Sequence, residues 1–88
     1  MARTVSDEEV VECFSEANIP LECWFLLDGL VCTWDPINLY FASQIIEDDD
    51  LYLASKEFLH RRGMVFPSQD AVTMYAREHR WPNQHLMP

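Results

Sequence analysis

Carboxylates dominate the part of the sequence that could carry chemistry, and their spacing is the first feature to explain. One set recurs every four residues, at Glu8, Glu12 and Glu16. In a helix, such residues lie on one face about 6 Å apart and would form a ridge of negative charge. A second set is consecutive, at Asp48, Asp49 and Asp50. The chemistry open to both sets is the attraction of a cation, either a metal ion or the basic side chains of a partner.

A metal site formed by Asp48, Asp49 and Asp50 with His60 finds little support in the sequence. Consecutive aspartates in a helix point in different directions, and Asp48 to Asp50 lack the spacing of an EF-hand loop. At the start of a helix they are explained by the helix dipole, but Glu16, near the end of its helix, is not. No Lys or Arg occurs between Arg3 and Lys56 to relieve the ridge. The ridge is therefore either a solvated helix face or a binding surface for a cationic protein.

Nucleophilic and metal-dependent catalysis find no support in the remaining residues. The three cysteines show no Cys-x-x-Cys spacing, and the three histidines lie far from them in sequence: Cys13, Cys23, Cys32, His60, His79 and His85. An odd number of cysteines without such spacing indicates neither a disulfide framework nor a zinc site. We expect a protein that is not an enzyme, with reduced cysteines, no metal and no cofactor.

A basic surface near the end of the chain offers a second alternative. Residues 1–50 hold twelve acidic residues and one Arg, whereas residues 51–88 hold five basic and three acidic residues. The basic set that could meet phosphates, together with a flanking aromatic ring, is Arg61, Arg62, Arg77, Arg80 and Trp81. The whole chain has a net charge of -9, however, which repels nucleic acid. Direct nucleic-acid binding is therefore the less favoured function.

The stretch of residues 21–34 is the densest apolar segment and organises the elements that position these side chains. Asp28-Gly29 separates two apolar runs, which favours a β-hairpin from Cys23 to Trp34 in which Leu27 faces Leu30. One face of this hairpin is wholly apolar, and the other is expected to be half covered. A helix that begins at Pro20 and ends at Gly29 is the competing interpretation.

The half-covered face of the hairpin predicts a first alternative function. Its apolar centre consists of Trp24, Leu26 and Val31. If these side chains are exposed, they form a patch through which this chain, as an accessory or regulatory subunit, could dock on a partner, or through which it could self-associate.

Four helices are expected around the hairpin. Capping residues and apolar periodicity place them at residues 7–17, from Asp35-Pro36 to Ile46, from about Leu51 to Gly63, and from Ser68 to just before Pro82. Residues 64–66 either add a short strand or bridge two helices, and residues 83–88 form a frayed tail. The predicted fold class is α+β and mainly helical, with an all-α five-helix bundle as the alternative.

Composition places the chain among small globular domains. Its 88 residues are 49% hydrophobic and predict one domain spanning residues 1–88. No apolar run is long enough to cross a bilayer, so we expect a cytoplasmic protein without a membrane partner.

Acidity and size together lead to the favoured function. In these two properties alone, the chain is similar to small acidic inhibitors such as phage anti-CRISPR proteins and nuclease-toxin immunity proteins, although it carries no motif of either group. The resemblance implies a protein that binds a basic surface and blocks nucleic-acid binding there, with carboxylates in place of phosphates. The expected binding surface is the ridge together with the three consecutive aspartates.

Overall fold

The computed structural model describes residues 3–35, 39–42 and 46–81, and shows a small α+β domain. Its elements in chain order are α1 (Asp7–Glu16), the short 3-10 helix η1 (Leu21–Cys23), β1 (Trp24–Leu27), β2 (Leu30–Asp35), β3 (Leu39–Ala42), α2 (Asp49–Arg61), β4 (Val65–Phe66) and α3 (Gln69–Glu78). The strands form one sheet in the order β3-β2-β1-β4, in which β4 runs parallel to β1 and the other pairs are antiparallel. No helix among these elements is long and apolar enough to span a membrane.

The predicted hairpin and its register are confirmed. Leu27 pairs with Leu30, and the pairing continues outward to Trp24 opposite Thr33. Asp28 and Gly29 adopt positive φ angles of 55° and 74°, which is the geometry that a tight two-residue turn between strands requires. The helical interpretation of this stretch and the five-helix bundle are therefore wrong.

The predicted helix from Asp35-Pro36 to Ile46 is also wrong, because β3 occupies Leu39–Ala42 and pairs with β2. Residues 36–38 and 43–45 lie outside the described part of the chain. The Asp-Pro pair is a common helix start, but two of the four residues of β3, Tyr40 and Phe41, are aromatic residues of a kind enriched in strands. Pairing with the open edge of β2 satisfies backbone groups that a helix at this place would leave to water. The described residues thus contain three α-helices and not four.

The other three predicted helices are confirmed, each with the expected cap. The Ser6 hydroxyl accepts a hydrogen bond from the Glu9 amide at 3.3 Å at the start of α1, and Ser68 accepts one from the Ala71 amide at 3.2 Å at the start of α3. Gly63 follows α2 with a φ of 72°, a conformation that glycine adopts without strain. Residues 64–66 contribute β4, which settles the alternative left open by their sequence. The tail at residues 83–88 is outside the described residues.

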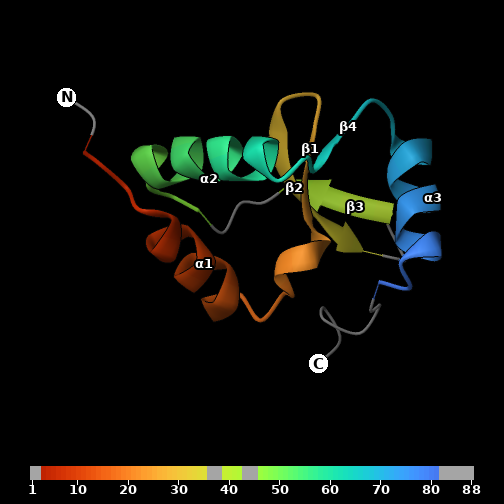
Figure 1. Cartoon of the computed structure of the whole chain (residues 1–88), viewed down its shortest axis with the longest axis horizontal. Coiled ribbons are helices and arrows are strands. Elements are labelled where there is room, and N and C mark those ends of the chain that lie inside the picture. The colour runs from red at the N-terminus through yellow and green to blue at the C-terminus, as the bar shows by residue number, and fades with distance from the viewer. Residues whose placement is uncertain (1–2, 36–38, 43–45, 82–88) are drawn as a thin grey trace.

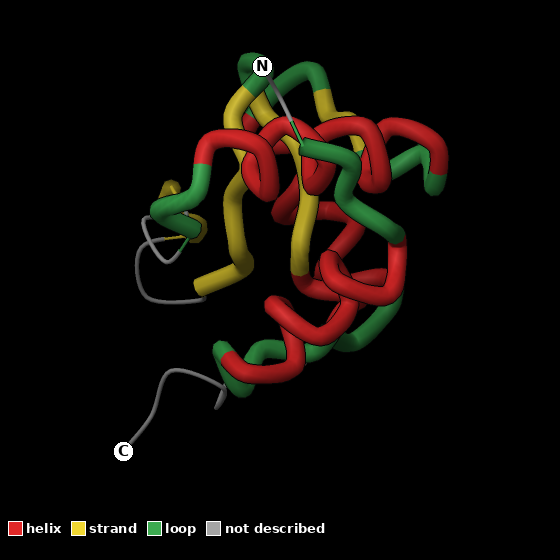
Figure 2. Tube along the Cα trace, turned by 90° about the vertical axis from the view of Figure 1, so that its left-hand side faces the viewer, coloured by secondary structure: helices red, strands yellow, loops and turns green. Residues whose placement is uncertain are grey.

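The sheet is covered on both faces, so its core has two halves. On one face, Trp24 stacks on Phe14 of α1, with ring centroids 4.0 Å apart, and α2 packs on β1 and β2. On the other face, the ring of Phe25 meets that of Trp81, which follows α3. Figure 1 shows the corresponding arrangement, with α1 and α2 on one side of the strands and α3 on the other. Figure 2 shows the same arrangement turned by 90° from the view of Figure 1, with the helices in red and the strands in yellow.

The hydroxyl of Thr33 is a buried polar group that destabilises this core. The residue is 0% exposed, and its hydroxyl has no hydrogen-bond partner among the described residues. A buried polar group without a partner destabilises the folded state by about 1–3 kcal/mol. We therefore expect Thr33→Val, which has nearly the same shape, to raise the free energy of unfolding by about 1 kcal/mol in urea titrations.

A matched control for this substitution is Thr73→Val. The Thr73 hydroxyl donates to the Gln69 carbonyl at 3.0 Å, so its removal brings no comparable gain. Equal stability changes in the two variants would contradict the interpretation of Thr33.

Candidate functional site: an acidic hollow between α1 and the start of α2

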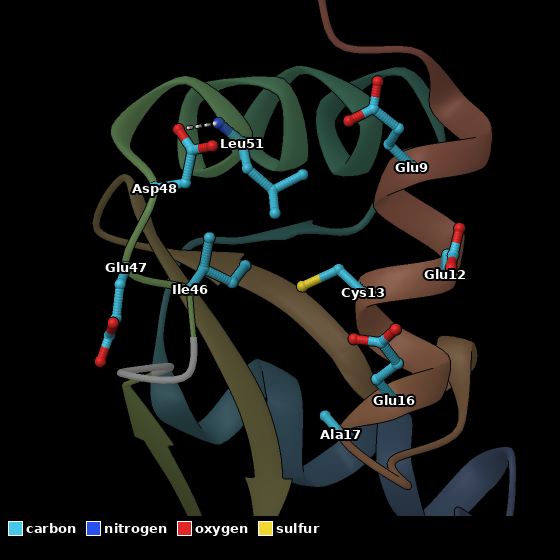
Figure 3. A pocket seen from close by; sticks show the side chains of 9 residues that line it. All are labelled: Glu9, Glu12, Cys13, Glu16, Ala17, Ile46, Glu47, Asp48 and Leu51. Atoms are coloured by element: carbon cyan, nitrogen blue, oxygen red, sulfur yellow. Dashed lines mark hydrogen bonds between the residues drawn. The ribbon is translucent and has the colours of Figure 1, made fainter.

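A hollow of about 500 Å³ lies between α1 and the segment that leads into α2. We call it the acidic hollow, because five of its nine lining residues are carboxylates. Its lining residues are Glu9, Glu12, Cys13, Glu16, Ala17, Ile46, Glu47, Asp48 and Leu51. Figure 3 shows this set from close by.

The spacing of residues along α1 determines which side chains face the hollow. Val10 and Phe14 are buried in the core, which fixes the rotation of the helix. Residues three and four apart share a helix face, so Glu9, Glu12 and Glu16 form one stripe on the exposed face of α1. All three are exposed. This stripe is one wall of the hollow.

The opposite wall is built around the start of α2. The Asp48 carboxylate accepts hydrogen bonds from the amides of Asp50 at 2.9 Å and Leu51 at 3.3 Å, through the single oxygen Oδ1. This N-cap fixes the position of Asp48 at the rim and leaves its other oxygen, Oδ2, for further contacts. Glu47, one residue earlier, is exposed. Both residues line the hollow, but the Glu47 side chain points away from α1 (Figure 3).

The floor of the hollow is apolar. Cys13 points from α1 toward Ile46, and Leu51 projects into the same gap (Figure 3). Ala17 completes this floor. Because the charged groups lie at the rim and the apolar groups below, the hollow resembles a surface for a side chain that carries a cation on an aliphatic stem.

Arg3 binds two of the rim carboxylates. Its guanidinium donates to Glu9 Oε2 at 3.0 Å and, through Nη2, to Asp48 Oδ2 at 2.6 Å. The hydrogen bond from Arg3 lowers the pKa of Asp48, as do the amides that Asp48 caps. A second arginine joins the helices outside the hollow: Arg61 donates two hydrogen bonds to Asp7, at 2.7 and 3.1 Å, and lowers the pKa of that carboxyl.

The cysteine of the hollow has no features of a nucleophile. Desolvation and the nearby charge of Glu16 raise the pKa of the Cys13 thiol. Burial likewise raises the pKa of Cys23 to about 12 and that of Cys32 to about 11. All three cysteines are free, and a raised pKa favours the neutral thiol over the nucleophilic thiolate. Within the described ranges, no three His, Cys, Asp or Glu side chains are placed to hold one metal ion.

The structure brings together only part of the acidic surface expected from the sequence. Glu12, Glu16 and Asp48 all line the hollow, whereas Glu8, Asp49 and Asp50 do not. Asp50 instead accepts a hydrogen bond from the Arg3 amide at 3.1 Å. Sequence reasoning missed Glu9, Glu47 and the role of Arg3. Glu9 had a detectable signal, since it precedes Glu12 by three residues and Glu16 by seven.

The apolar patch predicted at Trp24, Leu26 and Val31 is wrong as an exposed surface. These side chains are 0%, 5% and 0% exposed. They lie beneath α1 and α2, and the Trp24 indole nitrogen donates to the Ile19 carbonyl at 3.3 Å. The covering helices are remote in sequence, which is why the strand pattern alone does not reveal them.

The fold leaves only part of the predicted basic surface available to nucleic acid. Trp81 is only 7% exposed and packs against the rings of Trp34 and Tyr75, so it cannot stack on a base. The Arg62 guanidinium stands 5.4 Å from the centre of the Phe58 ring. Arg61 is engaged by Asp7, as described above, and Arg77 and Arg80 are exposed at and just beyond the end of α3.

Comparison with known proteins does not assign a family or a function to the hollow. No protein-family model, no curated protein and no solved structure matches the chain.

Proposed function

We propose that this chain is a non-enzymatic protein-binding protein whose acidic hollow receives arginine or lysine side chains of a partner. In its most concrete form, the partner is a protein that handles nucleic acid, and the carboxylates of the hollow occupy the basic groups that otherwise contact phosphates. The observation that carries the proposal is that five carboxylates, from two segments remote in sequence, line one hollow with an apolar floor.

Three of these carboxylates are available for a partner. Glu12, Glu16 and Glu47 are exposed and have no ion pair or hydrogen bond within the described part of the chain. The helix dipole does not explain Glu16 in the last turn of α1, where a negative charge is unfavourable. Glu12 and Glu16 therefore repel each other across one helical turn without a compensating gain in the folded monomer.

The contacts of Arg3 support a guanidinium as the group to be bound. Two carboxylates from different elements already hold one such group at hydrogen-bonding distance. Arginine binds carboxylates and phosphates through the same fork of N–H donors, so a surface that satisfies it competes directly with nucleic acid. The aliphatic stem of an arginine or lysine would lie on Ala17, Ile46 and Leu51.

Electrostatics also supports rapid capture of a basic partner. The chain has a net charge of -9, and opposite charges across an interface raise the association rate in a salt-dependent way. We place this activity in the cytoplasm, where reducing conditions keep free cysteines such as Cys13, Cys23 and Cys32 reduced.

Competition with nucleic acid tests this proposal. Partners captured from the native host at low salt are purified, loaded with labelled DNA or RNA, and titrated with the chain. We expect the nucleic acid to be displaced, and the displacement to weaken as salt rises from about 50 to 200 mM, because surface charges are screened. A ternary complex, or displacement that is insensitive to salt, would contradict carboxylate mimicry.

A further inference from the structure

Arg3 does not line the acidic hollow, but its guanidinium, the same chemical group that the proposed partner would bring, binds two of the carboxylates that do. Its Nη1 contacts Glu9 on α1, and its Nη2 and Nε both contact Asp48 Oδ2, the latter at 3.3 Å. The other oxygen of Asp48 is used by the N-cap of α2. Asp48 therefore has no oxygen left for a partner while Arg3 is in place, and Glu9 has one.

We propose that Arg3 is an intramolecular competitor for Glu9 and Asp48, two carboxylates of the acidic hollow, and that a guanidinium of the partner displaces it on binding. This inference rests on the proposed function. It divides the five carboxylates of the hollow into an open set, Glu12, Glu16 and Glu47, and a set that is released only when Arg3 leaves. Arg3 thus lowers the affinity of the hollow for partners that use Glu9 and Asp48, and leaves binding through the open set unchanged.

The ion pairs of Arg3 with Glu9 and Asp48 can break readily when a competing guanidinium arrives. The Arg3 side chain is 44% exposed, and the side chains of Glu9 and Asp48 are 46% and 43% exposed. Water screens such pairs, so they contribute little to stability and break readily. The caps of both helices do not depend on the guanidinium, because Ser6 caps α1 and Asp48 Oδ1 caps α2. Release of Arg3 therefore leaves the walls of the hollow in place.

The neutral variant Arg3→Gln tests the inference, with Arg61→Gln as its matched control. Both substitutions remove one positive charge and one ion pair with a carboxylate of α1. Arg3→Gln also removes the ion pair with Asp48, whereas the only partner of Arg61 among the described ion pairs is Asp7, which does not line the hollow. The probe is a nona-arginine peptide, titrated at low salt by calorimetry. We expect Arg3→Gln to bind it about two- to fivefold more tightly than Arg61→Gln does, a modest effect because exposed ion pairs are weak.

Two further measurements make the outcome decisive. Arg3→Lys keeps the charge without the fork of donors and is expected to fall between wild type and Arg3→Gln. In wild type, the NMR signal of Arg3 Nε is expected to shift when the peptide is added. Equal affinities of Arg3→Gln and Arg61→Gln, with an unmoved Arg3 signal, would overturn the inference while leaving the proposed function intact. Failure of wild type to bind the peptide at low salt would count against the proposed function itself.

Discussion

Trp24→Ala is expected to lower the free energy of unfolding by about 3–5 kcal/mol, the usual cost of truncating a large buried aromatic side chain. Trp24 is 0% exposed and stacks on Phe14 at an interplanar angle of 6°, which joins β1 to α1. The substitution also leaves the Ile19 carbonyl without its indole donor. Small domains are stable by only about 5–15 kcal/mol, so the variant should be close to unfolding at room temperature.

Urea titration followed by circular dichroism measures this effect. Leu53→Ala is the control, because Leu53 is a large apolar residue on α2 that is 55% exposed. We expect the control to change stability by less than about 0.5 kcal/mol. A loss below about 1 kcal/mol for Trp24→Ala would mean that this residue lies at the surface, as the strand pattern alone had indicated.

The hairpin illustrates what local sequence can predict. Asp28-Gly29 determines the turn, and the turn determines the pairing of every residue in β1 and β2. The pattern of alternation does not say which layers cover the two faces, since that depends on Phe14, Trp81 and other residues outside the hairpin. The register was therefore predictable, whereas the burial of Trp24 was not.

The strand β3 shows how a local signal can mislead. Asp35-Pro36 has the residues of a helix start, and apolar residues follow it at several helical positions. Pairing with β2 is a non-local interaction, and it overrides this preference at Leu39–Ala42. The short parallel pairing of β4 with β1 is equally non-local, which is why residues 64–66 could be read in two ways.

The acidic hollow depends partly on local sequence and partly on non-local packing. Helical spacing was sufficient to place Glu12 and Glu16 on one face of α1, and to mark their charge as unexplained by the helix. Glu12 and Glu16 line the same hollow as Glu47 and Asp48 because α1 packs beside α2. This packing cannot be predicted from the pattern of either segment alone. The same packing brings Arg3 to Asp48, 45 residues away in sequence.

The double variant Glu12→Lys/Glu16→Lys is expected to weaken binding of a basic partner by at least about 100-fold, because like charges placed opposite each other at an interface cost several kcal/mol. The loss should appear mainly as slower association, and the salt dependence of binding should disappear. Folding is expected to survive. The lysine introduced at position 12 would follow Glu8 by four residues in the favourable order, and a cation at position 16 suits the end of the helix, with a gain of about 0.2–0.5 kcal/mol for such a pair.

The control for this experiment is Glu22→Lys/Glu78→Lys, which changes the net charge by the same amount at two exposed positions that do not line the hollow. Melting temperatures and partner kinetics are measured on the same preparations. If the hollow is the binding site, the control retains most of its affinity, because charges away from the interface act only through the screened field of the whole protein. Equal losses in the two double variants would mean that net charge alone attracts the partner, and unchanged binding by the Glu12→Lys/Glu16→Lys variant would mean that this stripe of α1 is only a solvated face.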